Sequence, residues 1–257
     1  MLSIENVSIR YDQPERSTLA VKNVTLSMAA QDSLGLVGES GCGKSTLAHC
    51  ILRLLPPQGK IVGGKILWNG KDLAHASSEE IRLIRGNEIA MIFQDPFTSL
   101  NPVLSIEDQL TETVTLRHGI QGKPAREKAV EALQLVKIGD AEHRIKNYPH
   151  QWSGGMLQRA MIAMALIGRP KLLIADEPTT ALDVTVQKEI LDLLNELRKQ
   201  FQMGLLLITH NLALVQNTCA QVAVMRDGEI MEKGAVDQVL KSPAHPYTQK
   251  LLGAVPR

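Results

Sequence analysis

The chain has 257 residues, 44% of them hydrophobic and 21% charged, so it can bury a substantial core as one large domain or two modest domains. Its 28 basic side chains balance 27 acidic ones to a formal charge of +1, and the two signs are interleaved, which argues against a nucleic-acid-binding protein. The three cysteines show no zinc or disulfide spacing, and the N-terminus shows no secretory signal. No apolar run approaches the roughly 18–20 residues of a bilayer span, so we expect an intracellular protein that meets a membrane only through a partner.

The first third of the chain alternates β-rich runs with turns. Its Val, Ile and Leu content predicts strands over residues 2–9, 19–28, 33–37, 60–68 and 88–93. A glycine-rich turn after the third of these strands opens a helix that we predict over residues 44–55. Pro56-Pro57 is expected to stop this helix, because proline has no backbone N–H and clashes with the preceding turn.

The middle of the chain changes to polar helical segments, which we interpret as a helical insertion over residues 96–158. The elements predicted from there onward are helices over 106–117, 126–136, 156–167 and 184–199, strands over 171–175 and 204–209, and a hairpin of 221–225 with 229–233 around Asp227-Gly228. Strands that alternate with helices imply a largely parallel sheet.

The strongest motif is the run Gly38-Glu39-Ser40-Gly41-Cys42-Gly43-Lys44-Ser45, which matches G-x-x-x-x-G-K-S between a predicted strand and a predicted helix. Glycines let the backbone wrap a phosphate with converging N–H groups, and the following helix adds the positive end of its dipole. We therefore expect Lys44 to meet the β- and γ-phosphates of a nucleotide and the Ser45 hydroxyl to ligate Mg²⁺. A glycine-rich turn without a ligand is a poor alternative in this context.

A second motif, Asp176-Glu177, follows an apolar predicted strand. Asp176 is suited to hold Mg²⁺ through its water shell, and Glu177 is suited to orient and deprotonate an attacking water. A solvated strand end is the alternative interpretation of these two carboxylates. Together with the P-loop, however, they predict a nucleoside triphosphatase.

The run Ser153-Gly154-Gly155-Met156-Leu157-Gln158-Arg159 resembles the signature sequence of ABC ATPases, which other P-loop classes lack. The resemblance implies that the signature of one subunit closes over the γ-phosphate held by the P-loop of another. The residue types fit this role, because glycines permit close backbone approach. A helix that begins near Met156 would also point its N-terminus, with the Ser153 hydroxyl, at an anion.

The family pattern continues in order along the chain. It implies that Gln94 senses Mg²⁺ or the attacking water, and that Ala181-Leu182-Asp183 crosses a dimer interface. It also implies that His210 contacts the γ-phosphate and that Tyr11 stacks on adenine. The implied catalytic residues are Lys44, Gln94, Glu177 and His210, and the implied Mg²⁺ ligands are Ser45, Gln94 and Asp176. The implied ATP-binding residues are Tyr11, Gly38, Glu39, Ser40, Gly41, Cys42, Gly43, Lys44, Ser45, Thr46, Ser153, Gly154, Gly155 and Asp183.

Three positions depart from the commonest family pattern, namely Cys42, Trp152 and Asn211. None of them removes a reacting group, so we expect an active enzyme. Asn211 replaces the usual Asp after the histidine and is expected to cap the following helix as Asp would.

The resemblance implies an α/β fold, a P-loop ABC nucleotide-binding domain with an N-terminal antiparallel β subdomain and an inserted helical subdomain. We expect a single domain over residues 1–257. Within it, residues 1–95 and 159–240 are expected to form the RecA-like core with the β subdomain, residues 96–158 the helical signature subdomain, and residues 241–257 a C-terminal tail.

Two stretches resemble one subclass of the family. Residues 93–102 are similar to the glutamine loop of peptide and nickel importers, and residues 245–252 are similar to the tail that follows their nucleotide domain. Residues 154–164 are similar to the nickel-importer ATPase, and the chain stops at Arg257 without the longer extension typical of peptide-importer ATPases. These features favour nickel or a chelated metal over peptides as cargo.

The resemblance therefore implies the ATP-hydrolysing subunit of a bacterial importer, peripheral at the cytoplasmic face of the inner membrane, with ATP and Mg²⁺ as cofactors. Its implied partners are a second ATPase subunit, a paralogue in preference to a copy, two transmembrane permeases and an extracytoplasmic substrate-binding protein, and no nucleic acid. A soluble ABC ATPase of DNA repair or translation and the ATPase of an exporter share the catalytic residues, and both remain alternatives.

Overall fold

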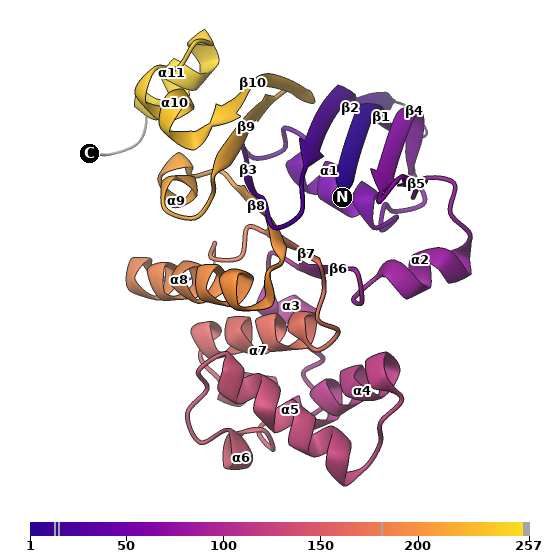
Figure 1. Ribbon diagram of the computed structural model, residues 1–257, viewed down its shortest axis with the longest axis vertical. Coiled ribbons are helices and arrows are strands. Elements are labelled where there is room, and N and C mark those ends of the chain that lie inside the picture. The colour runs from indigo at the N-terminus through magenta and orange to yellow at the C-terminus, as the bar shows by residue number, and fades with distance from the viewer. Residues whose placement is uncertain (13, 15, 181, 254–257) are drawn as a thin grey trace. The chain divides into compact units, whose positions relative to one another are not determined.

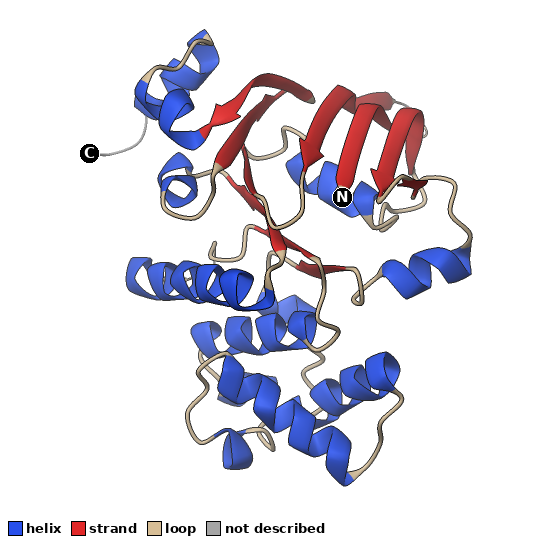
Figure 2. Ribbon diagram, viewed as in Figure 1, coloured by secondary structure: helices blue, strands red, loops and turns tan. Residues whose placement is uncertain are grey.

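The computed structural model describes residues 1–257 apart from Gln13, Glu15, Ala181 and residues 254–257 (Figure 1). The chain forms two compact units, Met1–Arg85 with Met203–Arg257 and Gly86–Gln202. Most strands belong to the first unit, while the second is mostly helical, as the colours of Figure 2 show. In the described part of the chain, no helix combines the length and the apolarity that crossing a bilayer requires.

An antiparallel sheet occupies the N-terminal part of the first unit, as the sequence predicts. Its strands lie in the order β2 (Ser17–Met28), β1 (Leu2–Asp12), β4 (Gly59–Trp68) and β5 (Lys71–Asp72). The buried side chains of β1 change from even to odd positions between Ile4 and Val7. The register shifts between these two residues, and Asn6 has a left-handed φ of 50°. This bulge keeps both apolar sets on the core face.

The first unit also contains strands in the order β10 (Glu229–Ala235), β9 (Gln221–Arg226), β3 (Ser33–Val37) and β8 (Gly204–Thr209). β3 pairs in parallel with β8 and with β9, and every residue of β3 and β8 is buried. A continuous apolar run is typical of a parallel strand that is covered on both faces. The predicted strands over 33–37 and 204–209 are confirmed residue for residue. The β9–β10 hairpin turns at Asp227-Gly228, whose φ angles of 48° and 88° fit a type I′ turn.

The helices of the first unit are α1 (Lys44–Ile51), α2 (Ser78–Ile84), α9 (Leu212–Gln216), α10 (Val236–Lys241) and α11 (Pro246–Gly253). The predicted end of the first helix at residue 55 is wrong, because α1 ends at Ile51 before either proline. Arg53 has a left-handed φ of 52°, and its N–H donates to Cys50 O at 3.0 Å while Leu54 N–H donates to His49 O at 2.8 Å. This pair of bonds is a Schellman motif, which ends the helix without help from proline.

The second unit contains two parallel strands, β6 (Ile89–Ile92) near its start and β7 (Leu172–Asp176) near its end. Its helices are α3 (Pro96–Ser99), α4 (Ile106–His118), α5 (Lys123–Leu135), α6 (Ala141–Arg144), the 3₁₀ helix η1 (Pro149–Gln151), α7 (Gly154–Leu166) and α8 (Val184–Phe201). The structure describes every residue between β6 and β7, and this segment contains helices and no strand. The helical character of the insertion is therefore confirmed, while its boundaries at 96 and 158 stay predictions.

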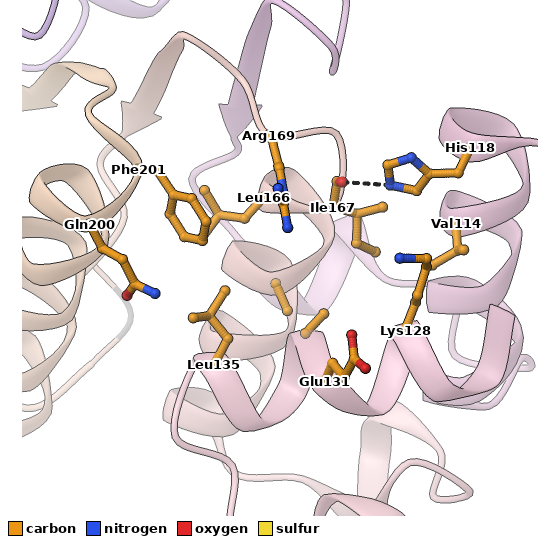
Figure 3. A pocket seen from close by; sticks show the side chains of 12 residues that line it. Val114, His118, Lys128, Glu131, Leu135, Leu166, Ile167, Arg169, Gln200 and Phe201 are labelled. Atoms are coloured by element: carbon orange, nitrogen blue, oxygen red, sulfur yellow. Dashed lines mark hydrogen bonds between the residues drawn. The ribbon is translucent and has the colours of Figure 1, made fainter. Parts of the chain in front are cut away.

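A surface hollow of about 540 Å³ lies among α4, α5 and the C-terminal ends of α7 and α8 (Figure 3). The ring of His118 closes one side of it, with Nε2 at 2.9 Å from Ile167 O. None of the site residues predicted from the sequence lines this hollow. Most of the predicted site residues lie instead in loops that follow strands.

Candidate nucleotide-binding site

The glycine-rich loop connects the buried strand β3 to helix α1, as the sequence predicts. Gly43 immediately precedes α1 with a φ of 107°, and a Cβ atom there would lie 2.4 Å from Ala20 O. Only glycine meets both conditions without strain. The first turn of α1 contains no acidic side chain, so its N-terminus keeps the positive potential that binds anions.

Lys44 is the buried cation of this loop, with 4% of its surface exposed. Its Nζ donates hydrogen bonds to Gly38 O and Glu39 O, both at 2.8 Å, and lies 3.8 Å from Cys42 Sγ. Buried charge requires such partners, and the loop supplies them by curling around the ammonium group. Burial raises the pKa of the Cys42 thiol, and Lys44 opposes this rise. The loop thus holds a cation among glycines, which is the arrangement that a triphosphate needs.

Tyr11 and His210 lie in the same unit as the loop. The Tyr11 hydroxyl lies 3.5 Å from Thr46 Oγ1, so the ring stands beside the first turn of α1. Val37 at the end of β3 is paired with Thr209 at the end of β8. The glycine-rich loop and His210 therefore leave two neighbouring parallel strands at the same edge.

Asn211 follows His210 and caps α9. Its Oδ1 accepts the N–H of Ala213 at 2.9 Å, and its own N–H donates to Thr209 Oγ1 at 3.0 Å. The expectation that Asn211 caps a helix as Asp would is confirmed.

In the second unit, the ends of β6 and β7 bring two predicted residues together. Ile92 pairs with Ala175, so Gln94 and Glu177 both follow the carboxyl ends of paired parallel strands. Gln94 Nε2 donates to Glu177 Oε2 at 3.3 Å, and Asp176 is buried with 3% exposure at the end of β7. Glu177 has a left-handed backbone φ of 44°. Residues other than glycine rarely adopt this conformation, and it recurs at functional sites.

Thr180 is a residue of this site that the sequence analysis missed. Its Oγ1 donates to Glu177 Oε2 at 2.8 Å, so two donors converge on one carboxylate oxygen. The signal available in the sequence was a hydroxyl three residues after the glutamate, in Glu177-Pro178-Thr179-Thr180. This signal is weak, because such short polar runs are common in turns.

The signature residues lie at the start of α7, which begins at Gly154, two residues before the predicted position. Ser153 is the N-cap, and its Oγ accepts Met156 N–H at 3.3 Å. A Cβ atom on Gly155 would lie 2.8 Å from Val186 Cγ1, so glycine there also serves close packing against α8. Asp183 caps α8 by accepting the N–H groups of Thr185 and Val186, each at 3.1 Å. Ala181, which the family pattern places in the same loop, lies outside the described residues.

The predicted residues thus fall into one group in each unit. The first unit holds Tyr11, the loop 38–46 and His210, and the second holds Gln94, Asp176, Glu177, the signature 153–155 and Asp183. Ser45 of the first unit, and Gln94 and Asp176 of the second, each carry an oxygen of the kind that Mg²⁺ prefers. Among the described residues no cluster of three or more His, Cys, Asp or Glu side chains could hold a metal alone.

Comparison with known proteins agrees with this geometry. Residues 21–180 match the model of the ABC transporter family, and residues 231–257 match the model of the oligopeptide/dipeptide transporter C-terminal region. A putative peptide import ATP-binding protein of Brucella abortus is 47% identical over 256 residues, which are 100% of this chain and 77% of that protein. The oligopeptide transport ATP-binding protein OppD of Haemophilus influenzae is 46% identical over 257 residues, 100% of this chain and 79% of that protein.

Solved structures give the same result for the fold. The dimeric structure of MJ0796, a bacterial ABC transporter cassette, superposes with a TM-score of 0.81 at 27% identity, and it covers 92% of this chain and 99% of that one. The same cassette in a post-hydrolysis state bound to ADP and Pi gives the same values. The predicted fold, an α/β ABC ATPase with an antiparallel β subdomain, is confirmed. The chain belongs to the ABC transporter family, as an ATP-binding subunit of its oligopeptide/dipeptide group.

Proposed function

We propose that this chain hydrolyses ATP to drive the import of di- or oligopeptides. The observation that carries the choice of cargo is the C-terminal segment 231–257, which matches the oligopeptide/dipeptide transporter region. Relatives such as the Brucella abortus and Haemophilus influenzae proteins are named for peptide import or oligopeptide transport. The preference for nickel that we drew from the sequence has no specific support among them, so peptides take first place.

The roles of the first unit follow from its geometry. The N–H groups of the loop and the start of α1 bind the phosphates. Lys44 keeps its hydrogen bonds to Gly38 O and Glu39 O and directs its remaining N–H donor to a phosphate oxygen. Tyr11 contacts the base from its position beside Thr46. His210 approaches the γ-phosphate from the end of β8.

The second unit supplies the hydrolytic groups. Glu177 accepts a proton from the attacking water, and the donors Gln94 and Thr180 fix the orientation of its carboxylate. Gln94 and Asp176, with Ser45 supplied by the first unit, would hold Mg²⁺, which neutralises phosphate charge when bound. Ser153, Gly154 and Gly155 face the nucleotide of a partner subunit, since a capped helix start with small residues suits an anion.

The proposed assembly contains a second ATPase subunit, a copy or a paralogue, with two permeases and an extracytoplasmic substrate-binding protein. The chain would lie at the cytoplasmic face of the inner membrane, because it binds the ATP of the cytoplasm and the permeases span the bilayer. A soluble ABC ATPase of DNA repair or translation and an exporter ATPase share the catalytic residues. Neither gains support from the C-terminal match.

The test is uptake in a strain that lacks this chain and is complemented with either the wild type or Lys44→Ala. We expect wild type to restore accumulation of a radiolabelled dipeptide or oligopeptide and Lys44→Ala to fail. Restoration of nickel uptake without peptide uptake would contradict the proposed cargo. Purification from membranes should recover two permeases, whereas recovery with ribosomes or DNA would contradict the importer.

A further inference from the structure

Helix α11 begins with His245-Pro246-Tyr247, a segment to which the proposed mechanism gives no role. Tyr247 is buried, with 4% of its surface exposed. Its hydroxyl oxygen accepts the backbone N–H of Glu39 at 3.4 Å. Burial raises the pKa of the Tyr247 hydroxyl, so the group stays a neutral phenol at physiological pH. The C-terminal helix therefore contacts the second residue of the phosphate-binding loop, within the same compact unit.

The contacted N–H belongs to the peptide group that joins Gly38 to Glu39. The oxygen of this same peptide group is Gly38 O, which accepts a hydrogen bond from Lys44 Nζ at 2.8 Å. In a planar trans peptide the N–H and the C=O point in opposite directions. Tyr247 and Lys44 are therefore hydrogen-bonded to opposite sides of the same peptide group, Tyr247 at its N–H and Lys44 at its C=O. A rotation of that plane would move the oxygen that anchors the Lys44 ammonium.

Tyr247 is itself held on two sides. The guanidinium carbon of Arg226, at the end of β9, lies 4.9 Å from the centroid of the Tyr247 ring. The N–H of Tyr247 donates to His245 Nδ1 at 3.1 Å, which fixes the first turn of α11. Glu232 of β10 accepts the N–H groups of Ala244 at 2.8 Å and His245 at 3.1 Å. The position of the Tyr247 hydroxyl is thus fixed by the β9–β10 hairpin and by the first turn of α11.

The contact lies at the opposite end of the loop from its anion-binding end. The family pattern also counts Gly38, Glu39 and Ser40 as ATP-binding residues, but the Glu39 N–H already donates to Tyr247. The phosphates are therefore assigned to the stretch where the loop enters α1, from Gly41 to Thr46, because the N–H groups and the dipole of the helix converge there. Removal of the Tyr247 hydroxyl would consequently delete no phosphate ligand. Any effect on nucleotide affinity would have to pass through the shape of the loop and the position of Lys44.

We propose that Tyr247 is a positioning residue that presets the phosphate-binding loop, through the Gly38–Glu39 peptide, for the triphosphate. The proposal rests on the ATP-binding function proposed above. A loop that is already ordered loses less conformational freedom when its ligand binds, and this raises affinity without a new contact to the ligand. The C-terminal segment thereby contributes to ATP affinity, although it touches no nucleotide.

The test is Tyr247→Phe, which removes the hydroxyl and keeps the ring beneath Arg226. The matched control is Tyr148→Phe, the same chemical change at an exposed tyrosine of the second unit. In nucleotide-free protein, we expect the Glu39 amide to exchange its hydrogen faster in Tyr247→Phe and at the wild-type rate in the control. A single long hydrogen bond predicts that Kd for ATP and for inorganic triphosphate rises about threefold. Turnover of the assembled transporter at saturating ATP should stay unchanged.

Every other result of these measurements contradicts either the positioning role alone or the proposed function as well. Unchanged Glu39 exchange or unchanged Kd in Tyr247→Phe, with wild type binding ATP, would overturn the positioning role and leave the proposed function intact. Tighter ATP binding would also overturn it, because the contact would then restrain the loop in an unproductive shape. A wild-type protein that binds neither ATP nor triphosphate would overturn the proposed function and the positioning role together.

Discussion

Replacement of Tyr11 by alanine tests whether the predicted aromatic ring binds the base of the nucleotide. The hydroxyl of Tyr11 lies 3.5 Å from Thr46 Oγ1, and a Cβ atom on Gly59 would lie 3.0 Å from the ring. The ring is therefore fixed beside the helix whose N-terminus binds the phosphates. A base that continues from those phosphates can stack on it.

The expected magnitude follows from the two parts of this side chain. Stacking of one base on an aromatic ring contributes about 1–3 kcal/mol, so Tyr11→Ala should raise Kd for ATP by about 5- to 150-fold. The hydroxyl contact at 3.5 Å is at the limit of hydrogen bonding, so Tyr11→Phe should change Kd by less than about twofold. Inorganic triphosphate carries no base, and its Kd should be the same in all three proteins.

Isothermal titration of wild type, Tyr11→Phe and Tyr11→Ala with ATP and with inorganic triphosphate measures these values directly. If Tyr11→Ala weakens both ligands equally, the ring acts on the loop through Thr46, and the stacking role is wrong. If neither ligand is affected, Tyr11 has no part in nucleotide binding. Thermal unfolding of the three proteins controls for a general loss of structure.

Three further predictions concern the second unit and the acid stability of the first. Glu177→Gln can keep both hydrogen bonds to its side-chain oxygen, so its affinity for ATP should persist. Turnover of the assembled transporter should fall about 10²- to 10⁴-fold, because the amide cannot accept a proton from water. Rapid turnover in this variant would contradict the role of Glu177 as the base. Ser153→Ala removes the α7 cap and should lower the free energy of unfolding by about 1 kcal/mol. Ser153→Ala should also lower turnover, because it removes the hydroxyl assigned to the phosphate. Ser153→Asn should restore the stability but not the turnover, and normal turnover in Ser153→Asn would exclude a phosphate role for the hydroxyl. The Lys71 ammonium first, and then the Ser77 N–H and hydroxyl, hold the pKa of Glu80 at about 2, below its ordinary 4.5. The stabilisation by Glu80 is therefore present above about pH 4.5 and lost as pH falls toward 2, so urea unfolding between these values should show a smaller pH dependence in Glu80→Gln.

Local patterns predict the fully buried strands well. The strands over 33–37 and 204–209 need no correction, because uninterrupted apolar runs with polar neighbours leave little choice of boundary. The end of α1 could not be predicted from the two prolines, since the left-handed Arg53 ends the helix first. Helix α2 was missed although Ser77 and Glu80 form a capping box, which is a signal present in the sequence.

The candidate site is less accessible to sequence reasoning than the fold. The motifs identify Lys44 and Glu177 because phosphate chemistry requires those residue types after a strand. The donors that orient Glu177 depend on tertiary structure, as Gln94 is 83 positions away along the chain. Tyr247 is 208 positions from Glu39, and no local pattern announces such a contact.

Strand register is the physical cause that joins these separate motifs into sites. Ile92 is paired with Ala175, and the chain continues from these partners to Gln94 and to Glu177, whose side chains meet at 3.3 Å. A slip of one residue between β6 and β7 would displace one loop by about 3.3 Å along the strand and break this bond. The same slip would exchange the side chains on the two faces of β6, where Ile89 and Ile92 are both fully buried, so the packing that excludes it also fixes the position of Gln94. The polar groups of the site are thus positioned by residues that never contact a nucleotide, and mutations that loosen β6 against β7 should lower turnover before they unfold the chain.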